Sequence, residues 1–406
     1  MVDEDFAWRL AQELVRIDSS DPGAYEDEIE RYIKALVEAQ LGRLSHPVLH
    51  AVQVEELEVL TGRRNLMVTV PGLSDEPRLV YICHMDTVTL DDGWDAGIPP
   101  LGAIVRDDKL YGRGACDMKG GLACAIAALV HTLERVAADG ALPRRGFSLI
   151  CSVDEEDFMR GSEAAIDAGW VGSREWVLDT EPTDGQIQVA HKGRTWFEIE
   201  MAGMTAHASQ PWKGADAVAA MAEVVCSLHR AFSALPPHEE LGPSTVTFGQ
   251  IEGGYRPYVV PDHAKVWVDM RLTPPTDTAA ATRMVEQAIA VAEAAVPGCR
   301  GSYVVTGDRP AIERDPNAPL LAALKRAADD VTDADTTIGF FTGYTDTAVI
   351  AGKTGNRNCM SYGPGSLALA HKPNEYVPHA DIVRCQQVLI ALADNVLWDA
   401  SGQVGA

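Results

Sequence analysis

LVYICHMD, at residues 79–86, is an apolar run that ends in a histidine and an aspartate. An uninterrupted apolar run of this length is typical of a parallel strand that is buried on both faces. His84 follows the run directly, and Asp86 lies on the same side of the chain if the extended geometry continues for two residues. The Asp86 carboxylate is then placed to accept the second N–H of the His84 imidazole, an arrangement that orients metal-binding histidines.

Two more polar clusters follow further along the sequence. Asp117 lies in GRGACDMKGG, residues 112–121, where a Gly-rich turn lets the backbone approach closely and leads into a helix-forming run. Glu155 and Glu156 follow a second apolar run, residues 147–153. Because ligand sites of α/β proteins form at the carboxyl ends of the strands, we expect these clusters to meet at one edge of a sheet.

A glutamate and a histidine further along the chain complete a set of metal ligands. Glu181 lies in DTEPT, residues 179–183, and His371 lies in AHKPNE, residues 370–375. Two imidazoles and several carboxylates suit two divalent cations such as zinc, and a carboxylate such as Asp117 has two oxygens with which to bridge them. Two cations a few ångström apart can share a water, lower its pKa and polarise a carbonyl or phosphoryl oxygen.

The acidic pair predicts a division of roles. Glu155 and Glu156 face opposite directions if the chain is still extended there. One of them can then bind a cation while the other acts as general base and returns the proton to a leaving nitrogen. Taken singly, each motif is more often a polar pair at a strand end, a surface dipeptide or a turn. Their joint occurrence after strand-like runs favours a catalytic site.

With these motifs in this order, the chain resembles the dinuclear zinc amidohydrolases related to acetylornithine deacetylase, succinyl-diaminopimelate desuccinylase, aminoacylase and glutamate carboxypeptidase. The resemblance covers nearly the whole chain, from the N-terminal helix to the His371 motif. It implies a zinc-peptidase-like catalytic domain of α/β class, with a central mixed sheet flanked by helices. It also implies two Zn²⁺ ions per subunit, for which Co²⁺ or Mn²⁺ can substitute.

The resemblance gives each residue of the cluster a role. Asp117 bridges the two cations, and Glu155 is the general base. The remaining ligands that it implies are His84, Glu156, Glu181 and His371. Asp179, two residues before Glu181, is a rival for that position, although the Pro-Thr that follows favours Glu181.

The order of elements indicates two domains, as the length of 406 residues also suggests. The first part shows an α/β alternation, with helices expected at 6–15, 25–41 and 120–138 and strands at 65–70, 78–83 and 147–153. From residue 194 the order becomes β-α-β-β-α-β, a split β-α-β or ferredoxin-like α+β arrangement. We therefore expect a catalytic domain at 1–193 and 305–406, interrupted by a lid or dimerisation domain at 194–304.

The resemblance extends to a histidine in the inserted domain. His207, in GMTAHAS at 203–209, matches a family histidine that reaches a catalytic site, in several members that of the other subunit. In that role His207 donates to the oxyanion of a tetrahedral intermediate. The alternative is a loop histidine with local hydrogen bonds.

Three further positions are candidates for substrate binding. Arg271 matches a family arginine that would pair with a substrate carboxylate, but an ordinary salt bridge with Asp269 is an equal alternative. Gly343 and Gly365 match backbone loops at the substrate end of such sites, although each can be a plain turn. Tyr258 stands where the family often has asparagine, so the geometry around a substrate carboxylate is open.

The composition argues against several classes of partner. A formal net charge of −25 and a pI near 4.7 repel nucleic acid and anionic membrane surfaces. The N-terminus is acidic, unlike a secretory signal, and we expect no stretch of membrane-spanning length, which predicts a cytoplasmic protein. The eight cysteines include no Cys-x-x-Cys pair and are expected to be reduced and mostly buried.

The leading hypothesis is a zinc amidohydrolase that cleaves the amide bond of a small N-acyl amino acid. A carboxypeptidase or dipeptidase acting on small peptides is the alternative, and family likeness suggests a homodimer formed through the inserted domain. A dinuclear phosphoesterase would use similar ligands but would need a basic or helix-terminal phosphate cradle. A non-catalytic binding protein on the same fold would have lost the base or a ligand, and all of them are present.

Overall fold

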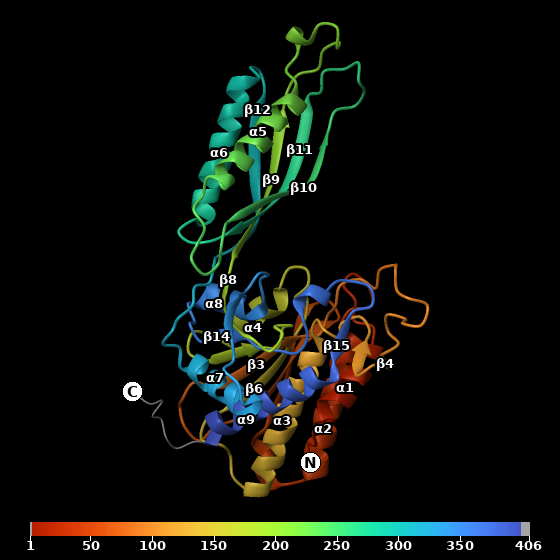
Figure 1. Cartoon of the computed structure of the whole chain (residues 1–406), viewed down its shortest axis with the longest axis vertical. Coiled ribbons are helices and arrows are strands. Elements are labelled where there is room, and N and C mark those ends of the chain that lie inside the picture. The colour runs from red at the N-terminus through yellow and green to blue at the C-terminus, as the bar shows by residue number, and fades with distance from the viewer. Residues whose placement is uncertain (1, 399–406) are drawn as a thin grey trace. The chain divides into compact units, whose positions relative to one another are not determined.

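The computed structural model describes residues 2–398, which form two compact units with separate hydrophobic cores (Figure 1). Among these residues, unit 1 consists of 2–189, 314–341 and 345–398, and unit 2 consists of 190–313 and 342–344. The predicted insertion at 194–304 lies inside unit 2, whose last strand continues to Arg309.

Unit 1 is built on a mixed sheet with the strand order β1-β2-β6-β3-β7-β14-β8-β13. The central strands β6, β3, β7 and β14 are parallel, whereas the β1-β2 hairpin and β8 pair with them in the antiparallel sense. All residues of β3 are buried, as expected of its apolar sequence. The bounds are β1 Gln53–Leu60, β2 Arg63–Val70, β3 Leu79–His84, β6 Phe147–Ser152, β7 Trp176–Asp179, β8 Ile187–His191, β13 Ile338–Phe341 and β14 Cys359–Ser361.

Two groups of helices contact this sheet. α1, α2, α3, α7 and α9 pack against one another, and α4 packs against α8. The apolar faces of the first group form the main hydrophobic core with the sheet. The bounds are α1 Phe6–Arg16, α2 Asp27–Leu44, α3 Lys119–Asp139, α4 Arg160–Asp167, α7 Pro319–Thr332, α8 Asp346–Thr354 and α9 His379–Trp398.

Helix α3 corrects one expectation. It is long and apolar enough to cross a membrane, with a mean hydropathy of 1.4 over its most apolar window, although no such stretch was expected from the sequence. Within the described part of the chain, 72% of that window is buried, and α3 contacts α1, α9 and β3. The apolar composition is therefore explained by a central position in the core.

A small antiparallel sheet with the order β15-β5-β4 joins two segments that are far apart in the sequence. β4 (Ile104–Arg106) and β5 (Lys109–Tyr111) precede the Gly-rich motif, and β15 (Tyr376–Pro378) follows the His371 motif. Pairing of Tyr376 with Tyr111 brings these two motifs together.

Unit 2 has the element order β9-α5-β10-β11-α6-β12 and an antiparallel sheet with the order β10-β11-β9-β12. This is the predicted split β-α-β, ferredoxin-like arrangement. Burial alternates along β9 and β11 because one sheet face packs against α5 and α6. The bounds are β9 Gly193–Ala202, α5 Ala217–Ser233, β10 Thr245–Gly253, β11 His263–Leu272, α6 Thr278–Ala295 and β12 Arg300–Arg309.

Candidate metal centre

His84 is the last residue of β3 and is buried. Its Nδ1 lies 2.9 Å from the backbone oxygen of Asp86, and because a carbonyl only accepts, Nδ1 carries the hydrogen. The Asp86 carboxylate is 3.8 Å away, so the expectation that this carboxylate accepts the His84 N–H is wrong. β3 ends at His84, and beyond it the carbonyl rather than the side chain of Asp86 meets the ring. Either acceptor leaves Nε2 free to bind a cation.

Asp117 lies between the two histidines. Its Oδ1 is 3.3 Å from His84 Nε2, and its Oδ2 is 3.5 Å from His371 Nε2. Each oxygen of one buried carboxylate thus faces a different imidazole, which is the geometry that a bridging ligand requires.

Each histidine has a second carboxylate beside it. Glu181 Oε1 lies 3.8 Å from His84 Nε2, and Glu156 Oε2 lies 3.0 Å from His371 Nε2. Two sets of three ligands result, which share Asp117. His371 sits in a loop with a left-handed φ of 61° and a half-exposed side chain, so its side of the cluster is the more open one.

Asp179 is held away from this cluster. It ends β7, and its Oδ2 accepts a hydrogen bond of 2.7 Å from Thr347 Oγ1. Glu181, two residues further on, lies beside His84 instead. The local geometry therefore favours Glu181 over its rival as a ligand.

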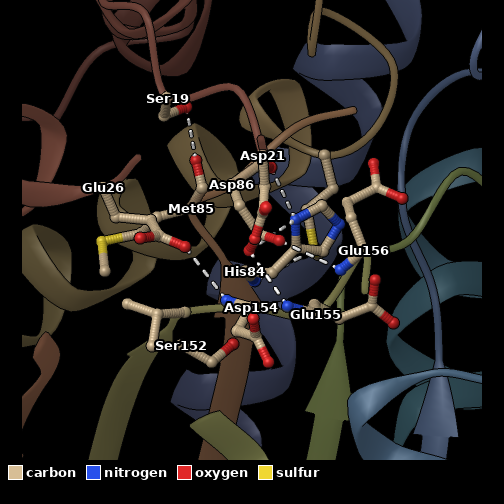
Figure 2. A network of polar contacts seen from close by, with 12 residues as sticks. Ser19, Asp21, Glu26, His84, Met85, Asp86, Ser152, Asp154, Glu155 and Glu156 are labelled. Carbon is tan, nitrogen blue, oxygen red and sulfur yellow. Dashed lines mark hydrogen bonds and ion pairs between the residues drawn. The ribbon is translucent and has the colours of Figure 1, made fainter. Parts of the chain in front are cut away.

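The acidic pair lies in a turn rather than on the extended chain that was expected. β6 ends at Ser152, and Asp154 has a left-handed φ of 65°. The two side chains nonetheless differ in their surroundings. Glu156 lies 3.0 Å from His371 and also groups with His84 and Asp117, whereas Glu155 groups with His84 and Glu181. Figure 2 shows the two glutamates next to Asp154 and Asp86. Glu155 is also buried.

The electrostatics of the cluster show an excess of negative charge. Burial raises the pKa of Glu155 and Glu181 well above the usual value, and neighbouring carboxylates add to the shift. Hydrogen bonds to Asp117 and Glu156 raise the pKa of His371 to about 10, so protons on the imidazole offset part of the charge. Burial works to raise the pKa of Asp117, but hydrogen bonds from His371 and His84 lower it below its usual value.

The donor set fits divalent cations. Among residues 2–398, no ion pair of the four cluster carboxylates, those of Asp117, Glu155, Glu156 and Glu181, involves lysine or arginine. The two imidazoles can balance only part of the charge of these four carboxylates, and uncompensated buried charge is costly. Imidazole nitrogen and carboxylate oxygen are ligands that zinc accepts, and two cations would supply the missing positive charge.

Two residues that the sequence reasoning did not assign hold the Asp117 turn. Glu375 Oε1 accepts hydrogen bonds from the backbone N–H groups of Cys116 (2.8 Å) and Asp117 (3.1 Å). Arg113 Nη1 donates to the other oxygen of Glu375 at 2.8 Å, and both side chains are buried. The signal was present, because Arg113 and Glu375 belong to the Gly-rich and His371 motifs themselves.

Gly365 lies in unit 1, with φ at +75°. A Cβ at this position would meet Cys116 Sγ at 2.7 Å, so glycine allows the loop to approach the turn that carries Asp117. Its oxygen accepts the N–H of Asp184 at 2.7 Å. Cys116, like most of the other cysteines, is buried and unpaired, as predicted.

The other predicted site residues belong to unit 2, whereas every residue of the metal cluster belongs to unit 1. His207 is exposed, and its Nδ1 lies 2.8 Å from the Ser209 hydroxyl and accepts the Ser209 N–H at 3.2 Å. Arg271 Nε donates to Asp269 at 2.8 Å, the salt bridge that was the alternative to substrate binding. Tyr258 is exposed, and Gly343 lies in the short segment 342–344.

Comparison with known proteins places this chain in a family. The chain belongs to peptidase family M20/M25/M40, whose match extends over residues 80–395. It is therefore a hydrolase of amide bonds. A relative from Staphylococcus aureus, described as "Probable succinyl-diaminopimelate desuccinylase", is 26% identical over 355 residues, which are 80% of this chain and 84% of that one. An acetylornithine deacetylase from Myxococcus xanthus is 28% identical over 330 residues, 80% of this chain and 82% of its own.

Solved structures share the fold. Aminopeptidase PepT from Bacillus cereus superposes with a TM-score of 0.75 at 22% identity, covering 96% of this chain and 98% of that one. A dinuclear metal-binding peptidase of family M20 from Bacillus subtilis superposes with a TM-score of 0.68 at 16% identity, covering 97% of this chain and 99% of that one. The predicted architecture, a mixed-sheet catalytic domain with a smaller α+β domain, is confirmed.

Proposed function

We propose that the protein is a dinuclear zinc amidohydrolase that cleaves the amide bond of small N-acyl amino acids. The observation that carries the proposal is the Asp117 carboxylate, whose two oxygens face two imidazoles, each with its own glutamate. One cation would be held by His84, Asp117 and Glu181, and the other by His371, Asp117 and Glu156. Co²⁺ or Mn²⁺ could replace zinc, because the ligands are the same for all three.

The chain's own residues supply the proton transfer. When bound, the two cations would lower the pKa of a water and polarise the carbonyl of the scissile bond. Glu155, buried beside His84 and Glu181, would take the proton of the attacking water and return it to the leaving nitrogen. Asp86 serves this step indirectly, since its carboxylate accepts the N–H groups of Glu155 and Glu156.

Residues of unit 2 complete the proposal. His207 is assigned the role of oxyanion donor, acting in the site of a second subunit within a homodimer formed through unit 2. Exposure of its side chain leaves it available for that role. Arg271 is assigned to the substrate carboxylate together with Gly343 and Gly365; this requires Arg271 to exchange its bond with Asp269 for one with substrate. We also propose that the enzyme is cytoplasmic.

The second candidate is a carboxypeptidase or dipeptidase, favoured by the peptidases among the proteins of similar fold. A panel of N-acetyl and N-succinyl amino acids and dipeptides separates the two. The stripped enzyme should be assayed with added zinc, cobalt and manganese. Turnover of N-acyl amino acids above dipeptides supports the first function, the reverse order supports the second, and metal-independent turnover would contradict both.

A further inference from the structure

We propose that Arg63 is a positioning residue for the turn that carries Glu155 and Glu156. A buried ion network centred on its guanidinium holds this turn by its backbone amides. The inference rests on the proposed function, because it concerns the general base and one ligand of that site. Arg63 lies on β2, whose neighbour β6 leads into the turn.

Three consecutive amides of the turn are bound to buried carboxylates (Figure 2). The Asp154 N–H donates to Glu26 Oε1 at 3.0 Å. The N–H groups of Glu155 and Glu156 donate to the two oxygens of Asp86 at 3.2 and 3.0 Å. Successive N–H groups of this kind form a concave anion site, and here the anions are the protein's own side chains. The positions of the base and of the ligand Glu156 thus depend on Glu26 and Asp86.

Glu26 is in turn held by Arg63. The guanidinium forms a bidentate pair with Glu26, with Nε at 2.7 Å from Oε2 and Nη2 at 2.5 Å from Oε1. Nη2 also donates to Asp21 at 2.6 Å, and Nη1 lies 3.3 Å from Asp154 Oδ1. A planar fork is needed for these contacts, which the single ammonium of lysine cannot reproduce.

The network needs this particular cation. Asp21, Glu26 and Asp86 offer oxygens within 4.8 Å of one another, and Asp154 is fully buried beside them. Their spacing would suit a metal ion, but the Arg63 guanidinium already bonds two of the three. A second arginine, Arg160, pairs with Asp154 from a side chain that is 40% exposed. Arg63 is therefore the buried countercharge that holds Glu26 in place.

Loss of Arg63 should weaken cation binding at one of the two positions and not at the other. The turn carries Glu156, which lies 3.0 Å from His371, whereas Glu181 is held on a different strand end. Removing an outer partner of a metal ligand costs about 10–100-fold in affinity or activity. Arg63 reaches Glu156 through Glu26 and the amide of Asp154, so in Arg63→Met binding at the Glu156–His371 position should weaken by at most that factor. The His84–Glu181 position should stay as in the wild type.

The test is a titration of the stripped full-length protein with Co²⁺, followed by its absorption spectrum, together with kcat and KM at saturating metal. We expect one of two binding steps to weaken in Arg63→Met and kcat to fall with KM unchanged. Arg145→Met is the matched control. Arg145 is also mostly buried in unit 1, where it pairs with Glu76 and stacks on Trp176. Its loss should lower stability but leave both cation steps intact.

Arg63→Lys provides the milder variant if Arg63→Met does not fold. It keeps the charge and loses the fork, so the same single step should weaken to a smaller degree. The proposal is overturned if folded Arg63→Met or Arg63→Lys binds both cations and turns over as the wild type does. It is also overturned if both steps weaken equally. A wild type that binds two cations but hydrolyses no N-acyl amino acid or dipeptide refutes the proposed function, while the titration still decides the role of Arg63.

Discussion

Replacement of Glu155 by glutamine should abolish most turnover without removing the metals. The side chain is buried, and burial together with the carboxylates of Asp346, Glu156 and Asp86 raises its pKa, with His84 opposing the shift. Within residues 2–398 the structure records no ion pair between Glu155 and a lysine or arginine, so the amide leaves no buried cation unpaired. Stability and metal content should therefore be kept.

The magnitude follows from the step that is lost. A positioned general base contributes about 10²–10⁴-fold to kcat. At about 1.36 kcal/mol for each factor of ten, this is roughly 2.7–5.4 kcal/mol of transition-state stabilisation. Because glutamine has the same shape, KM should change much less than kcat.

The assay is steady-state hydrolysis of the best substrate of the panel, with metal content measured on the same samples. Glu156→Gln is the matched variant, since it removes a neighbouring carboxylate that faces His371 at 3.0 Å. We expect Glu156→Gln to lose metal and Glu155→Gln to keep it. The reverse result, with metal shed only by Glu155→Gln, would show that the two roles are exchanged.

Three further predictions concern residues around the centre. His207→Ala should lower kcat with bound metal unchanged, and mixing it with Glu155→Gln should restore activity through hybrid dimers; an unchanged kcat would remove His207 from the mechanism. N-acyl amino acids should be hydrolysed roughly ten- to a hundred-fold faster than their methyl esters, a difference that Arg271→Ala should erase, and equal wild-type rates would refute the carboxylate assignment. Removal of metal should lower Tm by an amount that grows as pH rises from 6.5 towards the His371 pKa of about 10. The raised pKa means that protonated His371 stabilises the folded metal-free protein at low pH, and this stability is lost as pH rises through that window. A Tm difference between metal-bound and metal-free protein that does not change with pH would contradict the electrostatic account.

Much of the fold was predictable because the patterns are local. The apolar run before His84 indicated a buried central strand, and the change to β-α-β-β-α-β order indicated a second compact unit. Short elements were missed because their patterns are too short to recognise. β4, β5 and β15 have only three residues each, too few for periodicity to register, yet they join the Gly-rich motif to the His371 loop.

The metal cluster itself was predictable as a set of residues, but its supports were not. Asp86 was expected to hold His84 through its carboxylate, whereas the structure uses the backbone carbonyl and turns the carboxylate towards the amides of the acidic turn. Which atom of a residue meets a neighbour depends on the local path of the backbone, which the sequence pattern does not specify. The Arg63–Glu26 pair was missed because 37 positions separate the two residues in the chain, and the sequence pattern does not show that they meet.

The most direct test of the account is a crystal structure of the zinc-loaded enzyme with anomalous diffraction measured at the zinc edge. The account predicts two zinc peaks a few ångström apart, one beside His84 and Glu181 and the other beside His371 and Glu156. Asp117 should contribute one oxygen to each. A single peak, or a peak among Asp21, Glu26 and Asp86 in place of either expected one, would contradict the dinuclear centre.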